Sequence, residues 1–208
     1  MLTTSRCPIC RRSGGSPCRE CVELFAPLGR LRPPPGLDGL HAAVSYEDAA
    51  RPLITSLKYR DQRAATGWLA DAMVAVLPAS ARPEVVTWAP TTAARRRERG
   101  FDQAELLARA VARRLRVPAR RLLRRHAGPS QTGRSASERH RDVAAFVGVR
   151  RRPGNVVVLV DDVVTTGATL SAAATPLRRA GAARVIGLVA AATPAPGSTG
   201  GSVPSDDR

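Results

Sequence analysis

The stretch from Val156 to Leu170 constrains the fold of this chain more than any other. It opens with five apolar residues, 156–160, four of which are β-branched, and such a run is typical of a strand buried on both faces of a sheet. Two adjacent carboxylates, Asp161 and Asp162, follow where this strand is expected to end. A turn of threonines comes next, and then apolar residues recur at helical spacing, which predicts a helix that begins near Gly167.

The junction between this strand and this helix has the residue types that a sugar phosphate requires. A helix start presents unpaired N–H groups and a partial positive charge, which attract a phosphate. Gly167 has no Cβ, so an anion can approach the backbone closely. Asp161 and Asp162 accept hydrogen bonds, so they suit sugar hydroxyls, and the pair can also hold a divalent cation. The Gly-Lys-Ser/Thr of a Walker loop and the Gly-x-Gly-x-x-Gly of a Rossmann loop are both missing from this segment.

This segment resembles the phosphoribosyl-pyrophosphate (PRPP) signature of type I phosphoribosyltransferases, in which an apolar strand and two acids precede Thr-Thr-Gly-x-Thr. The resemblance implies that Asp161 and Asp162 are the catalytic acids, which hold the ribose and stabilise the positive charge that develops on it. An ordinary strand, turn and helix with a solvated acidic turn is the alternative. The residues that the resemblance assigns to the 5-phosphate are Thr165, Thr166, Gly167, Ala168 and Thr169.

All four cysteines lie near the N-terminus, as two Cys-x-x-Cys pairs. Cytosolic proteins rarely form disulfides, so this spacing favours a metal, and four thiolates suit tetrahedral zinc. Sulfur at all four positions leaves no open coordination position, so we expect a structural zinc ion. Unliganded thiols, a redox pair and an iron–sulfur cluster are the alternatives. The expected zinc ligands are Cys7, Cys10, Cys18 and Cys21.

Proline and glycine are frequent over residues 27–39, which indicates a linker between the cysteines and the main domain. Residues 40–46 are then expected to form a strand, and the helix that follows ends near Lys58. This lysine either complements the C-terminal end of that helix or reaches the pyrophosphate of PRPP, and the sequence favours neither interpretation.

A dense group of arginines, 95–99, follows a second expected buried strand, 85–90. Open α/β sheets bind ligands at the carboxyl ends of their strands, and arginine makes bidentate contacts with phosphates. This position therefore favours pyrophosphate binding, with Arg95 and Arg99 as the expected contacts, over a basic face that is merely solvated.

Residues Arg99 to Ala104 read Arg-Gly-Phe-Asp-Gln-Ala and resemble the Arg-Gly-Phe-Asn-Gln segment of the ComF family. ComF proteins are phosphoribosyltransferase-like and are associated with competence for DNA uptake. Asp102 stands where that family usually has asparagine. A carboxylate repels a phosphate, so we assign Asp102 no phosphate contact.

A polar loop that begins near residue 127 carries further positions that match the ComF family. Gln131 and Arg139 match, as does the later Ala145-Phe146, while Asp142 again replaces an asparagine. The resemblance implies a mobile hood over the sugar, with Gln131 and Arg139 as its contacts. Closure of such a hood would exclude water from the reactive sugar.

The formal net charge of +16, carried almost entirely by arginine, favours phosphate-rich small molecules or nucleic acid as partners. Arginine-rich codon usage in the source genome explains the same charge without any partner. An aromatic content of 3% argues against a stacking platform for single strands. No apolar run is long enough to cross a membrane and the N-terminus lacks a secretory pattern, so we expect a cytoplasmic protein without membrane insertion.

The expected fold class is α/β: a type I phosphoribosyltransferase fold, with a parallel sheet and flanking helices, behind a small zinc knuckle of four cysteines. The order of the elements carries this expectation, because strands and helical patterns alternate along most of the chain. The expected parts are a knuckle over 1–26, a linker over 27–39, the phosphoribosyltransferase-like domain over 40–192 and a disordered tail over 193–208.

Three functions fit these features. The first is an enzyme that binds PRPP with Mg²⁺ and transfers the phosphoribosyl group to a nitrogen acceptor that the sequence does not identify. The second is a protein that binds PRPP or another ribose-phosphate nucleotide without turnover, as a sensor or a component of DNA uptake. The third is a nucleic-acid binder that uses the knuckle and the arginines, with single-stranded DNA or DNA-uptake proteins as partners.

Overall fold

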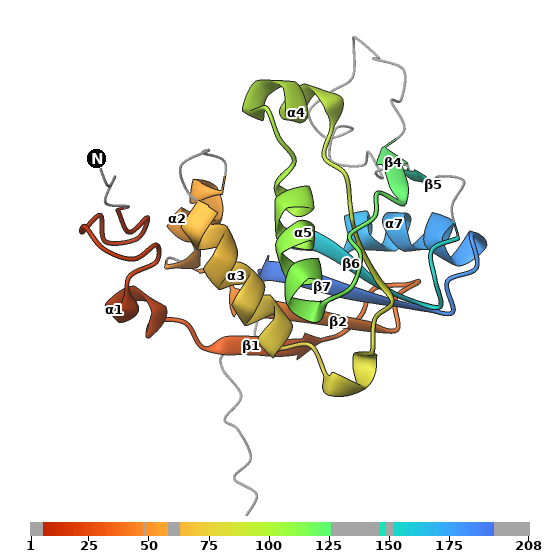
Figure 1. Cartoon of the computed structure of the whole chain (residues 1–208), viewed down its shortest axis with the longest axis horizontal. Coiled ribbons are helices and arrows are strands. Elements are labelled where there is room, and N and C mark those ends of the chain that lie inside the picture. Colours follow the sequence, from red (N-terminus) through yellow and green to blue (C-terminus); the bar gives the residue numbers. More distant parts are fainter. Residues whose placement is uncertain (1–5, 48, 58–62, 126–145, 149–151, 194–208) are drawn as a thin grey trace, which may run out of the picture.

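The computed structural model describes residues 6–47, 49–57, 63–125, 146–148 and 152–193. A five-stranded sheet with helices on both faces forms the body of the protein (Figure 1). In chain order the elements are α1 (Arg19–Val22), β1 (Pro27–Leu31), β2 (Gly39–Ser45), α2 (Ala50–Ser56), α3 (Arg63–Ala75), a 3-10 turn (Ala79–Ala81), β3 (Val85–Trp88), α4 (Ala93–Arg99), α5 (Gln103–Leu115), β4 (Leu123–Arg125), β5 (Phe146–Gly148), β6 (Val156–Val164), α7 (Ala168–Arg179) and β7 (Arg184–Ala192).

The predicted α/β fold is confirmed. The strand order is β1-β2-β7-β6-β3, and the pairings β2 with β7, β7 with β6, and β6 with β3 are all parallel. Parallel neighbours need a crossover connection, which α7 supplies between β6 and β7. β6 therefore lies inside the sheet, and its carboxyl end meets those of β3 and β7 at one edge, where open sheets of this kind bind ligands.

β6 is buried on both faces, as its run of apolar residues predicts. Val158 and Val160 belong to the core on the side of α2, α3 and α5, whereas Val157 and Leu159 belong to the core on the side of α7. Leu159 is fully buried, so its truncation to alanine is expected to destabilise the fold by about 2–5 kcal/mol.

Two predicted boundaries are wrong. β6 does not end before the aspartates but continues to Val164, because β7 is long enough to pair with it as far as Ala192. The stretch 27–39, expected to be a linker, contains β1, which pairs antiparallel with β2 at the edge of the sheet. Pro27 is tolerated there because an edge strand has one side without a partner strand.

Two short elements were not predicted. The arginine group forms the short helix α4, which stands away from the sheet in Figure 1. β4 and β5 pair antiparallel as a separate two-stranded sheet. Each of these strands has three residues, too few for the alternation of apolar and polar residues to be recognisable in the sequence.

The N-terminal region is attached to the main body through aromatic contact. The ring centroids of Phe25 and Trp68 lie 5.1 Å apart, and Ile9 also packs against the core beneath α3 and α5. Trp68 on α3 is partly buried and packs against the same core.

Candidate functional site

A cavity of about 180 Å³ lies at the carboxyl end of β6. Its walls come from β6, from the first turn of α7, from the loop after β3, from the start of α5 and from β4. The predicted acidic pair thus faces a cavity, together with one of the predicted threonines. The lining residues are Ala89, Pro90, Thr91, Asp102, Gln103, Ala104, Arg125, Asp161, Asp162, Val163 and Thr169.

The two adjacent carboxylates are held in place by the backbone of β6. Asp161 accepts a hydrogen bond from the N–H of Asp162 at 2.9 Å, and Asp162 accepts one from the N–H of Val163 at 2.8 Å. Burial, and then the negative charge of Asp162, raise the pKa of Asp161 well above its usual range. The fully ionised pair is therefore unfavourable by itself, and a cation or hydroxyl donors would stabilise it.

The turn after β6 has the backbone geometry of a tight entry into α7. Gly167 has a φ of +75° and immediately precedes the helix, and the Thr166 hydroxyl accepts a bond from the N–H of Ala168 at 3.4 Å. Of the residues predicted to bind phosphate, only Thr169 lines the cavity. Thr165, Thr166 and Ala168 are exposed to solvent.

Gly167 packs closely against Pro34, which differs from the expectation that its missing Cβ leaves room for an anion. A Cβ built at Gly167 would lie 2.9 Å from both Cβ and Cγ of Pro34. The space beside this glycine is therefore occupied by a proline from the stretch that was expected to be a linker, and is not left open for an anion on that side. Close packing and the positive φ together account for glycine here.

Asp102 lines the same cavity as the acidic pair and also connects two segments of the fold. Its carboxylate caps the N-terminus of α5 by accepting from the N–H of Glu105 at 3.4 Å, and also accepts from the N–H of Thr91 at 2.9 Å. Burial raises the pKa of Asp102, and these N–H donors oppose the shift. An acidic N-cap with Glu105 three residues later, before an apolar helical pattern, is a signal from which the cap could have been predicted.

The other predicted contacts lie outside the described part of the chain. This holds for Lys58, Gln131 and Arg139, and for the side chains of Arg95 and Arg99 within α4. Arg125, by contrast, lines the cavity without having been predicted, and its guanidinium lies 5.6 Å from the centre of the Phe146 ring. One arginine among so many in the sequence gives no signal of such a role.

The four cysteines come together as predicted. Their Sγ atoms all lie within 4.8 Å of one another, and those of Cys10 and Cys18 are 3.5 Å apart. Zinc–sulfur bonds of about 2.3 Å in a tetrahedron place sulfur atoms roughly 3.8 Å apart, so the cluster fits a structural zinc ion.

Backbone N–H groups favour the thiolate form of Cys7. Burial disfavours its thiolate, but N–H groups of Cys10, Cys18 and Ile9 point at the sulfur and lower its pKa to about 6. The N–H of Cys18 lies 3.5 Å from this sulfur. A thiolate at neutral pH is the form that binds a metal.

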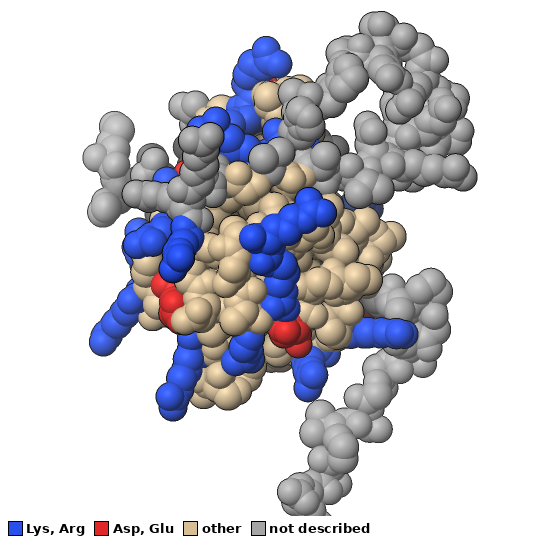
Figure 2. All heavy atoms as spheres, turned by 90° about the vertical axis from the view of Figure 1, so that its right-hand side faces the viewer, with Lys and Arg blue, Asp and Glu red and all other residues tan. Residues whose placement is uncertain are grey.

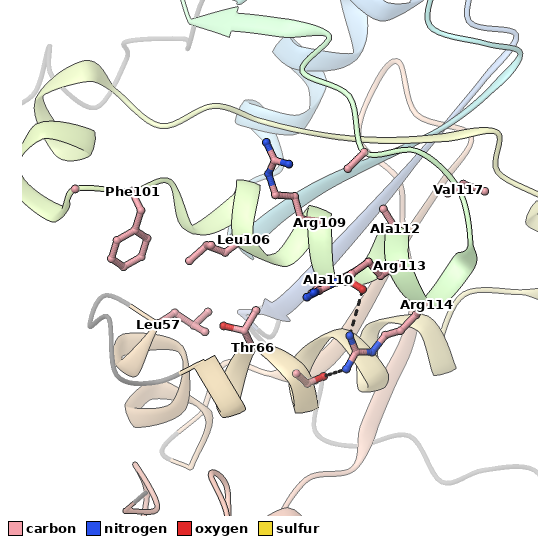
Figure 3. Close-up of a pocket in the computed structure, with 13 residues that line it drawn as sticks. Leu57, Thr66, Phe101, Leu106, Arg109, Ala110, Ala112, Arg113, Arg114 and Val117 are labelled. Carbon is pink, nitrogen blue, oxygen red and sulfur yellow. Dashed lines mark hydrogen bonds between the residues drawn. The ribbon is translucent and has the colours of Figure 1, made fainter. Parts of the chain in front are cut away.

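A larger pocket, of about 850 Å³, lies between α3 and α5, away from the acidic pair (Figure 3). Arginines and apolar residues line it, but Arg114 is engaged in holding the two helices together. Its guanidinium donates to the carbonyls of Gly67 at 2.7 Å and Ala110 at 3.2 Å, and it pairs with Asp71. Among the described residues that line this pocket there is no carboxylate pair, so it lacks the features of a sugar-phosphate site.

The positive charge is not gathered into a single stripe on the face that Figure 2 shows. Arginine side chains are spread over this face, with acidic side chains between some of them. This distribution agrees with an arginine-rich composition as the main source of the charge. Within the described residues, no helix is long and apolar enough to cross a membrane.

The family match covers the part of the chain that contains the acidic pair, and the similar proteins cover most of the chain. Residues 102–199 match the family described as the phosphoribosyl transferase domain. The chain is 32% identical over 196 residues to the DNA utilization protein YhgH of Escherichia coli O6:H1, with 86% of each chain covered. It is 31% identical to the protein of the same name from Escherichia coli K12, with the same coverage.

Among solved structures, that of the allosteric regulatory enzyme of purine biosynthesis gives a TM-score of 0.44 at 22% identity. The match covers 66% of this chain and 30% of the other, so this chain spans about a third of the length of that enzyme.

Proposed function

The chain belongs to the ComF family of phosphoribosyltransferase-like proteins, and from this premise we propose that it binds PRPP with Mg²⁺ in the cavity at the end of β6. We further propose that it transfers the phosphoribosyl group to a nitrogen acceptor. The cavity that contains Asp161, Asp162 and Thr169 is the observation that carries this proposal.

In the proposed reaction, the bond between ribose C1 and the pyrophosphate oxygen breaks and pyrophosphate leaves with the bonding electrons, while a nitrogen of the acceptor forms a bond to C1 and releases its proton to water. Asp161 and Asp162 hold the ribose hydroxyls, and their negative charge stabilises the cationic sugar. The 5-phosphate binds to the turn 165–169 at the start of α7, where N–H groups and hydroxyls are donors. Pyrophosphate binds to the arginines of α4. Mg²⁺, when bound, would neutralise part of the charge on the leaving pyrophosphate.

The electrostatics of the cavity support this assignment. Two adjacent acids, one with a raised pKa, form a site that gains stability from a cation or from several hydroxyl donors. Arg125 lines the same cavity and offers a positive group for a phosphate. These features suit a ligand that has hydroxyls at one end and phosphate at the other.

A transfer assay tests the proposal. The protein is incubated with PRPP, Mg²⁺ and, separately, purine, pyrimidine and amine acceptors, and pyrophosphate release is measured. We expect acceptor-dependent release that falls at least a hundredfold in Asp161→Asn/Asp162→Asn, because removal of groups that act in the transition state typically has effects of this size. Asp71→Asn, which removes an exposed acid far from the cavity, is the matched control. Release that persists in the double variant would contradict the proposal.

A second function is favoured by the relatives, whose name refers to DNA utilization. In this alternative the chain serves in DNA handling, either by binding PRPP or a nucleotide without turnover or by binding DNA. Saturable PRPP binding without pyrophosphate release would favour a non-catalytic binding role. DNA affinity that falls steeply with salt and is unchanged in the Asp161→Asn/Asp162→Asn variant would favour a DNA-binding role.

A further inference from the structure

Both ends of the segment 91–101, which contains α4, return to the rim of the cavity. Thr91 at its start and Asp102 just after its end both line the cavity, while α4 itself extends away from the sheet (Figure 1). A segment that extends away from the sheet in this way depends on specific contacts at its ends to have a defined position. Its arginines can contribute to a site only if that position is held.

Asp102 makes those contacts with both of its carboxylate oxygens. Oδ2 accepts from the N–H of Thr91 at 2.9 Å, and Oδ1 accepts from the N–H of Glu105 at 3.4 Å. One side chain therefore joins the first residue of the segment to the first turn of α5. Only 4% of Asp102 is exposed, so solvent competes little for these two bonds.

Glu105 extends the same connection to α4. Its carboxylate lies 4.0 Å from the guanidinium of Arg96 and 2.8 Å from that of Arg109. Arg96 is half exposed, so this ion pair contributes less than the buried bonds of Asp102. The two acids together connect the start of the segment, α4 and α5.

We propose that Asp102 is a positioning residue whose two oxygens close the segment 91–101 onto α5 and so hold α4 and its arginines beside the cavity. Two acceptor atoms are required, because the donors are two separate N–H groups. Asparagine has only one oxygen, and its amide NH₂ would face a donor at the other position. The carboxylate therefore makes one bond that asparagine would not. The closure is a property of the fold, whereas its effect on ligand binding rests on the proposed function.

Two substitutions separate the closure of the segment from the cap of α5. A serine hydroxyl still caps a helix but is too short to reach a second donor, so Asp102→Ser keeps the cap and loses the bond to Thr91. Asp102→Asn keeps one of the two bonds. Asp71→Asn is the matched control, because it removes a carboxylate that is bonded to α5 through Arg114 and does not contact the segment.

Hydrogen exchange tests the closure without any ligand. In Asp102→Ser we expect the amides of residues 91–101 to exchange roughly tenfold faster than in the wild type, because the loss of one buried hydrogen bond changes an opening equilibrium by about this factor. Asp102→Asn, which also keeps only one of the two bonds, should likewise exchange faster than the wild type, and Asp71→Asn should equal the wild type. Equal exchange in wild type and Asp102→Ser would overturn the proposal, whatever the protein binds.

Ligand binding tests the effect on the site. Asp102→Ser should weaken binding of Mg²⁺–PRPP roughly tenfold and weaken binding of ribose 5-phosphate clearly less, because only PRPP has the pyrophosphate that contacts the arginines. An equal loss for both ligands would indicate general destabilisation and would overturn the positioning role. If the wild type binds neither ligand, the proposed function is wrong. The hydrogen-exchange measurement then still shows whether Asp102 holds the segment 91–101 against α5.

Discussion

Replacement of Gly167 by alanine tests whether the turn after β6 has the packing that the structure shows. Gly167 combines a φ of +75° with a neighbour, since an added Cβ would lie 2.9 Å from Cβ and Cγ of Pro34. Gly29 has the same φ of +75°, and a Cβ added there would meet nothing within 4 Å. Gly29→Ala is therefore a control for backbone strain without a steric clash.

The two contributions can be separated in magnitude. A left-handed backbone costs alanine about 1–2 kcal/mol, and this is the whole expected effect of Gly29→Ala. Overpacking against Pro34 adds about 1–2 kcal/mol, so Gly167→Ala should reduce the free energy of unfolding by about 2–4 kcal/mol in all. Pro34→Ala removes Cγ, one of the two clashing atoms, and keeps Cβ, so it should recover only part of this loss in the double variant.

Urea denaturation followed by circular dichroism measures these differences in the wild type, the three single variants and the Gly167→Ala/Pro34→Ala double variant. Equal destabilisation by Gly29→Ala and Gly167→Ala would refute the close packing on Pro34. So would a double variant in which the two effects simply add.

Three further predictions concern the acidic pair, the metal and the helix pair. The pKa of Asp161 is raised in the fold, so the stability that its protonated form contributes is present below the unfolded pKa of about 3.9 and is lost as pH rises through the folded pKa. Asp161→Asn should therefore raise the melting temperature of the ligand-free protein at pH 8 and have little effect near pH 4; a constant difference between these pH values would contradict the assigned pKa shift. The purified protein should hold one zinc ion per chain, and its removal by a chelator should lower the melting temperature and change the fluorescence of Trp68, which contacts Phe25; a change that persists in Trp68→Phe would contradict this origin. Arg114→Ala should destabilise the protein by about 1–3 kcal/mol and Asp71→Ala by about 0.5–1 kcal/mol, because Arg114 also donates to two carbonyls and Asp71 is largely exposed; equal effects in urea denaturation would show that the carbonyl bonds contribute little.

The parts of the fold that the sequence predicts correctly are those with strong local signals. The apolar run at 156–160 identifies a strand buried on both faces, and the later apolar residues identify a helix that begins at Ala168. The cysteine spacing likewise predicts that four sulfur atoms come together, as they do in the structure. In each case the whole pattern lies within one element or one short segment, so it can be recognised without knowing how the rest of the chain folds.

The features that the sequence did not reveal depend on contacts between distant segments. β1 was expected to be a linker because its proline and glycine carry no strand signal, yet pairing with β2 makes it an edge strand. The packing of Pro34 on Gly167 joins residues more than a hundred positions apart and leaves no local pattern. Arg125 enters the cavity through the pairing of β4 with β5, whose strands are too short to be recognised.

The candidate site was predicted in part. Asp161, Asp162 and Thr169 were identified from residue types and order, because a strand, two acids and a hydroxyl-rich turn form one continuous segment. The double role of Asp102 was not identified, since its bond to Thr91 depends on how the chain returns after α4. The candidate ligand-binding residues can thus be identified from the sequence, whereas the residues that hold them in position can be identified only from the structure.

Calorimetric titration of PRPP, with and without Mg²⁺, tests the central claim most directly. The wild type is compared with Asp161→Asn/Asp162→Asn and with the control Asp71→Asn. We predict saturable binding that requires Mg²⁺, is unchanged in the control and is weakened at least a hundredfold in the double variant, because both groups expected to hold the ribose and the cation lose their charge. Equal affinity of the wild type and the double variant for PRPP would contradict the assignment of the sugar-phosphate site to the end of β6.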